Sequence, residues 1–561
     1  MPAEPSTALA AGDAEPAAVP GVTRLGVDVR SLPWFRPLAG DYAYNYAIVS
    51  SLFAGDPSAP ASWTAALSRR RAGTYDGSRI AAVLARQQER RGAPQAARAA
   101  AARLAESGTV AVVTGQQAGA FGGPLFTLLK SVTAIQLARK VSAEHGVPCV
   151  PVFWVDAEDH DWEEVGACTV LDGAYQARTI ELAAPEGAGD RPVATLTLDE
   201  RIAEPLEALR AALPATDFTA WVMDGLRAHY VAGAGMADAF ARWIEGLLGP
   251  QGLVVFDSSD PAAKPLAAAV FAREIAQPGH TASLALAAGQ RLAERGHEPQ
   301  VTPAPDAVAL FHLNGGREPI RRHDDGFQIG DVLRTPSALA EEVRDHPERF
   351  SPNVLLRPIV QDTLFPTICY VPGPSELAYL GQLGEVYEHF GIPMPLLYPR
   401  GTATLVDSAA LRFVTRYNVP LEELQRQDES ALNRLLQAQL PADVERALAD
   451  ADDTVRTAMH RAIEAMPLLD PTLAGAARTT LGKMEHELKT LRNKVIQAAK
   501  RRDETLRRQF TRAQAQYFPL GHPQERTLAV VFFLNRYGPA LADRLIERLP
   551  LDMGQHWIMT L

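Results

Sequence analysis

The chain has 561 residues, of which 47% are hydrophobic and 22% are charged, proportions typical of a globular protein with a buried core. This length predicts several domains, and the composition excludes a globally disordered chain. The 55 Lys and Arg residues against 66 Asp and Glu residues give a formal charge of −11, which argues against a dedicated nucleic-acid binder.

Cysteine usage and the lack of long apolar runs indicate where the chain works. Its three cysteines, Cys149, Cys168 and Cys369, are too few and too scattered for a disulfide framework or a cysteine zinc site, and they favour a reducing compartment. No apolar stretch approaches the ~20 residues that a membrane-spanning helix needs. Residues 1–20 are rich in Ala, Pro and Glu without a basic leader, so we expect a flexible tail. We therefore expect a cytoplasmic protein.

The first strong pattern along the chain is a strand, a loop, a helix and a second strand. Residues 109–115 form a β-branched run that ends in Gly, residues 116–124 are Gly-rich, and residues 125–145 have a helical pattern. Gly146 ends this helix, and residues 149–155 form another short apolar run. This order predicts a βαβ unit, whose ligand-binding edge lies at the carboxyl ends of its parallel strands.

Later segments extend the same architecture. Further strands are expected at residues 253–256 and 367–371, the latter followed by a helix over 377–390. We therefore predict an α/β fold in which residues 21–415 form a doubly wound parallel sheet, interrupted by insertions near residues 171–249 and 279–352.

The last third of the chain changes in character. Residues 416–516 are rich in Leu, Ala, Glu, Arg and Gln, which predicts a domain of long helices. One stretch spaces its apolar residues three and four apart, as a coiled-coil seam does: Leu481, Met484, Leu488, Leu491, Val495 and Ala498. An intramolecular hairpin with residues near 432–463 and a dimeric coil fit this seam equally well. We expect residues 517–561 to form a C-terminal helical segment that packs back on the core.

The Gly-rich loop carries the first candidate site residues, Gly115, Gln116 and Gln117. Glycines after a strand let backbone amides approach a ligand, and the following helix N-terminus favours an anion. A tight turn that packs the helix on the sheet explains the glycines equally well. It explains the paired glutamines less well, because ligand pockets use such amides as donors and acceptors.

The strongest local signal is the run Glu158, Asp159, His160 and Asp161, directly after the strand at 149–155. A carboxylate beside His160 can orient the imidazole as an acid or base, and the other acids can hold an ammonium group. The alternative is an acidic, solvated loop with a helix cap. The position after a buried strand favours the site.

A third group follows in residues 351–362. Arg357 can bind a carboxylate or phosphate through two parallel hydrogen bonds, or it can pair with an acid at the boundary of an insertion. Asn353, Gln361 and Asp362 add polar groups, and Arg400 ends another apolar run that can reach the same edge. Both interpretations of Arg357 stay open at this point.

Three strings together resemble a known family, the bacillithiol biosynthesis cysteine-adding enzymes called BshC. They are VVTGQQAGAFGGPLFTLLK, PVFWVDAEDHDWEEV and SPNVLLRPIVQDTLFPTICYVPGPSELAYLGQL, which begin at residues 112, 151 and 351. The ending YFPLGHPQERTLAVVFFLNRYGP, from residue 517, is similar to the C-terminal segment of the family. The resemblance covers nearly the whole chain from about residue 22.

The resemblance implies a Rossmann-like core with connecting-peptide insertions and a helical coiled coil that forms a homodimer. It implies a ligase that joins cysteine to the amine of glucosaminyl-malate, the last step of bacillithiol biosynthesis. It also implies a pocket that includes Lys130 besides the residues named above. From the chemistry of the acidic run, we expect Glu158, Asp159, His160 and Asp161 to act in catalysis, with His160 as the preferred base. Asp156 receives no role.

The chemistry and the competing functions complete these expectations. Forming an amide in water needs an activated acyl group, so ATP or another nucleotide can take part, although the sequence leaves the cofactor unknown and predicts no metal site. The alternatives are a metal-dependent hydrolase or nucleotidyltransferase that uses the acidic run, and a non-catalytic coiled-coil scaffold. For the ligase, the partners are the two small substrates, with no nucleic acid and no membrane. The segments at Gly115, Glu158 and Arg357 are expected to meet around a single cavity.

Overall fold

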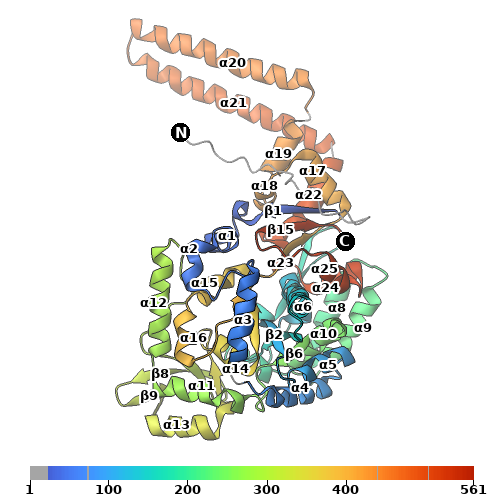
Figure 1. The fold of residues 1–561 in the computed structure, drawn as a ribbon. Coiled ribbons are helices and arrows are strands. Elements are labelled where there is room, and N and C mark those ends of the chain that lie inside the picture. Colours follow the sequence, from blue (N-terminus) through green and yellow to red (C-terminus); the bar gives the residue numbers. More distant parts are fainter. Residues whose placement is uncertain (1–22, 73–74, 439, 503) are drawn as a thin grey trace. The chain divides into compact units, whose positions relative to one another are not determined.

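The computed structural model describes residues 23–72, 75–438, 440–502 and 504–561 (Figure 1). Its contacts divide these residues into two compact units, which are treated separately below. One contains residues 406–522, and the other contains residues 23–405 together with 523–559. The expected tail at residues 1–20 lies outside the described residues.

A five-stranded parallel sheet organises the larger unit and confirms the predicted doubly wound, Rossmann-like fold. All of its neighbouring strands are parallel. In spatial order the strands are β13 (Leu396–Leu397), β12 (Thr367–Val371), β2 (Val110–Gln117), β3 (Cys149–Asp156) and β6 (Val254–Asp257).

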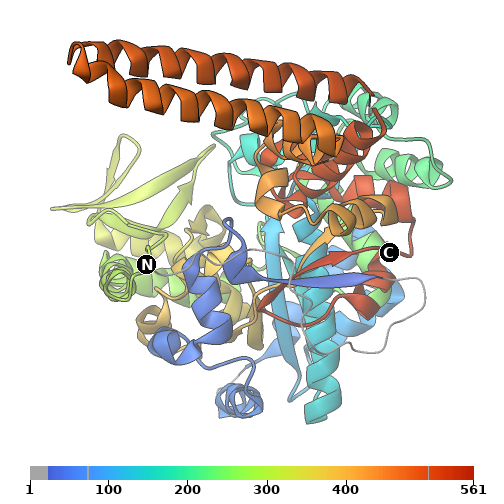
Figure 2. The same cartoon turned by 90° about the horizontal axis from the view of Figure 1, so that it is seen from above.

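Helices cover both faces of this sheet because its central strands are apolar on both sides. Helix α6 (Leu125–His145) starts after Pro124 and ends at Gly146, whose left-handed backbone (φ 63°) suits glycine. Val110 and Val112 of β2 pack with α6 and with α3 (Pro60–Ala72) in one apolar cluster. Ala111 and Val113 face the opposite side, which is covered by α4 (Gly77–Arg91), α5 (Gln95–Arg103) and α11 (Lys264–Ala276) (Figures 1 and 2).

The strand order reverses direction between β2 and β12. The chain runs from β2 through α6 to β3 and then to β6 on one side, whereas β12 and β13 extend the sheet on the other side. Ligands of open α/β sheets bind at such a switch point, outside the carboxyl ends of the strands. The fold therefore directs attention to the ends of β2, β3 and β12.

Two insertions interrupt the sheet. The first contains a hairpin of β4 (Ala167–Leu171) and β5 (Ala177–Glu181), followed by helices α8 (Ala203–Ala212), α9 (Thr219–His229) and α10 (Met236–Leu248). The second contains α12 (His280–Glu294), α13 (Pro336–Asp345) and an antiparallel sheet that the sequence pattern did not predict. In spatial order its strands are β10 (Val332–Arg334), β9 (Gly326–Ile329), β8 (Arg317–His323), β7 (Ala307–Leu313) and β11 (Phe350–Pro352).

A small sheet ties both ends of the larger unit together. Strand β15 (Gln555–Met559) pairs with β1 (Arg24–Asp28) and with β14 (Thr402–Leu405). Between β14 and β15 the unit contains the helices α23 (Gln524–Thr527), α24 (Val530–Tyr537) and α25 (Leu541–Arg548). The C-terminal segment is thus helical first and ends in a strand, which its sequence did not indicate.

The smaller unit is helical. Its short helices are α17 (Ser408–Tyr417), α18 (Leu421–Gln425) and α19 (Ser430–Gln437), and its last helix is α22 (Glu504–Tyr517). The long helices α20 (Ala442–Ala465) and α21 (Leu473–Arg502) lie side by side as an antiparallel hairpin (Figures 1 and 2). The Arg456 and Glu485 side chains approach to 3.4 Å across it. Helix α21, which carries the predicted seam, therefore pairs with α20 within the chain, although Met484 and Leu491 of the seam are 41% and 47% exposed. The homodimer stays a prediction.

One local expectation differs from the structure. The helix expected over 377–390 is broken into α15 (Leu377–Leu380) and α16 (Gly384–Phe390). Arg357 is the first residue of α14 (Arg357–Leu364), where Pro358 suits the first helical turn. None of the described helices combines the length and the apolar character needed to cross a bilayer.

Candidate functional site

Three strand ends bring the predicted segments together. Gln117, the last residue of β2, lies opposite Asp156, the last residue of β3. Strand β12 ends at Val371, which lies opposite Thr114, so β2 continues past the end of β12. The backbone carbonyl of Gly115 is therefore open to side chains from the switch point. The residues around these ends form the strand-end site described below.

Lys130 joins β2 to the segment after β12. Its ammonium donates to the Gly115 carbonyl (2.9 Å), to Gln116 Oε1 (3.2 Å) and to Glu376 Oε1 (2.5 Å). Burial alone would raise the pKa of Glu376, but the Lys130 ammonium holds that pKa below its usual value, so the pair is ionic. Because these acceptors satisfy the ammonium, Lys130 positions the loop and does not offer an open charge.

Asp159 connects β2 to the acidic run. Its Oδ2 accepts a hydrogen bond from Gln117 Nε2 (2.5 Å), and its Oδ1 accepts one from the backbone amide of His160 (2.8 Å). His160 Nδ1 lies 3.4 Å from the same Oδ1, and 43% of the His160 side chain is exposed. A fixed carboxylate beside an accessible imidazole is an arrangement suited to proton transfer.

The other two acids of the run have structural contacts. Glu158 is buried and forms an ion pair with Lys264, and Ser351 Oγ donates to its Oε2 (3.2 Å). Lys264 Nζ also donates to the carbonyl of Phe350 (3.0 Å), so this pair joins α11 to β11. Asp161 is exposed and caps α7 (Trp162–Val165) by accepting the amide of Glu164 (3.0 Å). The helix-cap interpretation therefore describes the contacts of Asp161, and the catalytic duty stays a prediction for both acids.

Arg357 is held by neutral groups. Its Nη1 donates to Gln361 Oε1 (3.1 Å), and its Nη2 donates to the Tyr379 hydroxyl (3.3 Å). The guanidinium carbon lies 5.6 Å from the centroid of the Tyr370 ring. Gln361 Nε2 in turn donates to Asp362 Oδ1 (2.9 Å). Gln361 therefore orients Arg357 directly, and Asp362 orients Gln361.

The remaining two predicted residues form local contacts. Asn353 Oδ1 accepts the amides of Leu355 (3.0 Å) and Leu356 (3.2 Å), which turns the chain into α14. Arg400 is 2% exposed and forms two parallel hydrogen bonds with Glu525 (2.9 and 2.7 Å), which is 3% exposed. Its charge is thus matched within the protein, and it joins β14 to α23.

The Gly-rich loop is packed against the C-terminal segment. The amide of Leu125, the first of α6, donates to the carbonyl of Leu528 (2.9 Å), and the amide of Val530 donates to the carbonyl of Gly123 (2.9 Å). A Cβ added at Gly122 would lie 3.0 Å from the indole of Trp243. These contacts agree with the tight-turn interpretation of the glycines, and the first amide of the helix N-terminus expected to attract an anion is already bonded.

Several site residues were missed by sequence reasoning. Asp156 is half-buried at the end of β3, and burial raises its pKa, with the Arg357 guanidinium as the largest opposing influence. Arg317, from the second insertion, places Nη1 3.4 Å from Asp159 Oδ1 and donates through Nη2 to the carbonyl of Pro352 (3.1 Å). Lys264 follows β6, which ends at the same sheet edge. This position in the sequence could have identified Lys264 as a site residue. Arg317 has no such local signal because it comes from an insertion.

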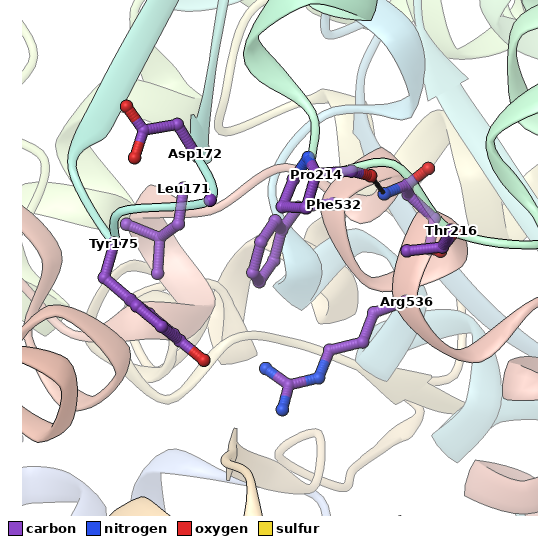
Figure 3. Close-up of a pocket in the computed structure, with 9 residues that line it drawn as sticks. Leu171, Asp172, Tyr175, Pro214, Thr216, Phe532 and Arg536 are labelled. Carbon is purple, nitrogen blue, oxygen red and sulfur yellow. Dashed lines mark hydrogen bonds between the residues drawn. The ribbon is translucent and has the colours of Figure 1, made fainter.

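Two further observations delimit the site. A cavity of about 260 Å³ lies between the β4–β5 turn and α24, where Figure 3 shows Tyr175, Phe532 and Arg536 around it. None of its lining residues belongs to the predicted site. The contacts above bring the three segments together at one edge, whereas an enclosed cavity around them stays a prediction. Within the described ranges, no group of three or more His, Cys, Asp or Glu side chains is arranged to hold a metal ion.

Comparisons with known proteins match both parts of the chain to one family. Residues 27–401 match the family model "Bacillithiol biosynthesis BshC, N-terminal Rossmann-like domain", and residues 403–561 match the corresponding "C-terminal coiled-coil domain". A relative from Salinibacter ruber, named "Putative cysteine ligase BshC", is 34% identical over 94% of this chain and 96% of its own length. Relatives with the same name from Koribacter versatilis and Symbiobacterium thermophilum are 33% and 34% identical, over 85% and 86% of this chain and 88% and 90% of their own lengths.

Proposed function

The chain belongs to the bacillithiol biosynthesis BshC family, and we propose that it is the ligase that joins L-cysteine to the amine of glucosaminyl-malate, the last step of that pathway. The reaction forms one amide bond between the cysteine carboxyl group and the sugar amine, with net loss of water. Such a reaction needs a group that holds a carboxylate and a base that removes a proton from the amine.

The observation that supports this proposal is that Arg357 and Asp159 both act electrostatically on Asp156, the last residue of β3, while His160 lies beside Asp159. Arg357 supplies a fixed positive charge whose acceptors, Gln361 and Tyr379, are neutral, so it can bind a carboxylate. His160 is accessible and lies beside the carboxylate of Asp159, which can orient its imidazole, so it can accept the amine proton.

The activating co-substrate is a separate question. Acyl activation by a nucleotide would need a site for its phosphates, but Lys130 is paired with Glu376 and the first amide of α6 is bonded to Leu528. These residues do not fit a phosphate site, so we assign no step of the reaction to a nucleotide. The assay below therefore includes arms with ATP, with other nucleoside triphosphates and with none.

The test is a cysteine-addition assay with the purified full-length protein, read by mass spectrometry of the thiol product. We expect product from the wild type and at least about a hundredfold loss in His160→Ala and in Arg357→Ala, since each removes a group that acts on the reacting atoms. Circular dichroism should show that both variants remain folded. Cells that lack the protein should accumulate glucosaminyl-malate.

A matched control separates this effect from the loss of any histidine. His346 is exposed, and its Nδ1 lies 3.1 Å from Glu348, a contact similar to that of His160 with Asp159. His346→Ala should keep the wild-type rate. Wild-type rates in both His160→Ala and Arg357→Ala would end the proposal.

A further inference from the structure

Most charges at the strand-end site are matched by a partner within the protein. Three ion pairs account for them: Lys130 with Glu376, Lys264 with Glu158, and Arg317 with Asp159. Arg357 and the carboxyl group of Asp156 belong to none of these pairs. They act on each other electrostatically, yet no ion pair joins them.

Arg357 has capacity for a further acceptor. It uses one N–H on Gln361 Oε1 and one on the Tyr379 hydroxyl, and a guanidinium has more donors than these. Burial raises the pKa of Tyr379 to about 12, so its hydroxyl is neutral at ordinary pH. The positive charge of Arg357 is therefore held in place without being neutralised by a bonded carboxylate.

Asp156 has the complementary property. Among the described residues, none donates a hydrogen bond to its carboxylate, although Gln117 lies opposite it across the sheet. The neighbouring strand shows that this is not general for such positions. Asp257, the last residue of β6, accepts the amide (2.9 Å) and the hydroxyl (2.7 Å) of Ser259 through its Oδ1. The Asp156 carboxylate is thus left open to a donor from outside the chain.

We propose that Arg357 and Asp156 together bind the zwitterion of an α-amino acid, with Arg357 on the α-carboxylate and Asp156 on the α-ammonium. A zwitterion carries both charges on one small molecule, so a single ligand satisfies the two groups that the protein leaves unmatched. The identification of this amino acid as cysteine rests on the proposed function. The assignment gives Asp156 a substrate-binding role that the sequence pattern did not predict.

The experiment measures binding separately from turnover. Calorimetry with the full-length protein, alone and with saturating glucosaminyl-malate, compares L-cysteine with 3-mercaptopropionate, which lacks the ammonium, and with cysteamine, which lacks the carboxylate. Asp156→Asn should weaken cysteine binding by about tenfold to a hundredfold, as expected for a lost charge-assisted hydrogen bond, and leave 3-mercaptopropionate unchanged. Arg357→Gln should weaken the binding of L-cysteine and of 3-mercaptopropionate, which both carry a carboxylate, and leave the affinity for cysteamine unchanged.

Controls make the result specific. Asp257→Asn removes the same charge at the neighbouring strand end and should leave all three affinities unchanged. Asp156→Ser provides a second, smaller replacement, and the thermal unfolding midpoint shows whether each variant is folded.

The outcomes separate the two proposals. The predicted binding pattern without formation of the thiol product would support the amino-acid site and overturn the proposed reaction. Two results would overturn the role of Asp156 while the product still forms. In one, Asp156→Asn lowers the affinities for cysteine and for 3-mercaptopropionate equally. In the other, it lowers neither affinity. The absence of cysteine binding to the wild type in both arms would overturn this role as well.

Discussion

Arg357 at the start of α14 and Arg400 before β14 are both arginines of the larger unit, but their surroundings differ. Arg400 meets a carboxylate, Glu525, through two parallel hydrogen bonds, and both side chains are almost completely buried. Arg357 meets an amide oxygen and a hydroxyl, and Asp156, which acts on it electrostatically, is not bonded to it. The first arrangement joins parts of the fold, whereas the second keeps a charge available. An arginine that the protein holds in place without a bonded carboxylate is therefore the better candidate for binding a ligand.

The largest expected effect comes from breaking the Arg400–Glu525 pair. Arg400→Ala leaves Glu525 as a buried carboxylate without its partner, which should lower the free energy of unfolding by about 3–5 kcal/mol. Urea unfolding followed by circular dichroism measures this loss. Arg400→Lys keeps the charge but not the two parallel bonds, so its loss should be smaller. A loss below about 1 kcal/mol in Arg400→Ala would contradict the joining role, because that is the range of exposed pairs.

The same substitution at the other arginine should cost less stability. No carboxylate is bonded to Arg357, so Arg357→Ala strands no buried charge. The buried Gln361 Oε1 does lose its donor, and we therefore expect the free energy of unfolding to fall by about 2 kcal/mol. The same urea unfolding measures it beside Arg400→Ala. Equal losses in the two variants would mean that Arg357 is also a joining residue, and the comparison would fail.

The parallel sheet could be predicted from sequence because its signals are local. The β-branched run that ends in Gly115, the helix that stops at Gly146 and the apolar run at residues 149–155 each carry their own pattern. Strands β2 and β3 and helix α6 occur there, and β2 extends beyond the predicted run to Gln117. The antiparallel sheet of the second insertion could not be predicted in this way. Its strand β8 is mostly polar and buries only Ile320 among its seven residues, so apolar alternation is weak there.

The candidate site divides along the same line. Gln117 and Asp159 follow neighbouring parallel strands, so their meeting was predictable, and a hydrogen bond joins them. Asp156 was given no role because the sequence does not show whether a carboxylate will find a hydrogen-bond donor. Only the tertiary structure shows that its neighbours do not bond it. Arg400 was predicted as a site residue although it pairs with Glu525 inside the fold. Glu525 is distant in sequence, so no local pattern indicates that pair.

A third arginine–carboxylate pair, in the helical unit, tests the intermediate case. Arg512 donates to Asp407 Oδ2 through Nε (2.8 Å) and Nη2 (2.6 Å), and 39% of the Arg512 side chain is exposed. Asp407 Oδ1 also caps α17 by accepting the amide of Ala410 (2.8 Å). Although burial alone would raise it, the Ala410 amide and the Arg512 guanidinium lower the pKa of Asp407 to about 2.

This lowered pKa fixes the sign of a pH effect. An ionised Asp407 stabilises the folded helical unit fully above the ordinary pKa of 3.8, and this stabilisation is lost as the pH falls towards 2. Asp407→Asn keeps an acceptor for the Ala410 amide but loses the charge, so it should cost about 1 kcal/mol at neutral pH and nothing further on acidification. Hydrogen exchange of the α17 amides between pH 4 and 2, corrected for intrinsic rates, measures both. Asp443→Asn, at an exposed pair with Arg446 (3.4 Å), is the control and should change neither. If the Asp407→Asn and wild-type proteins lose protection equally on acidification, a different carboxylate controls the acid sensitivity of this unit.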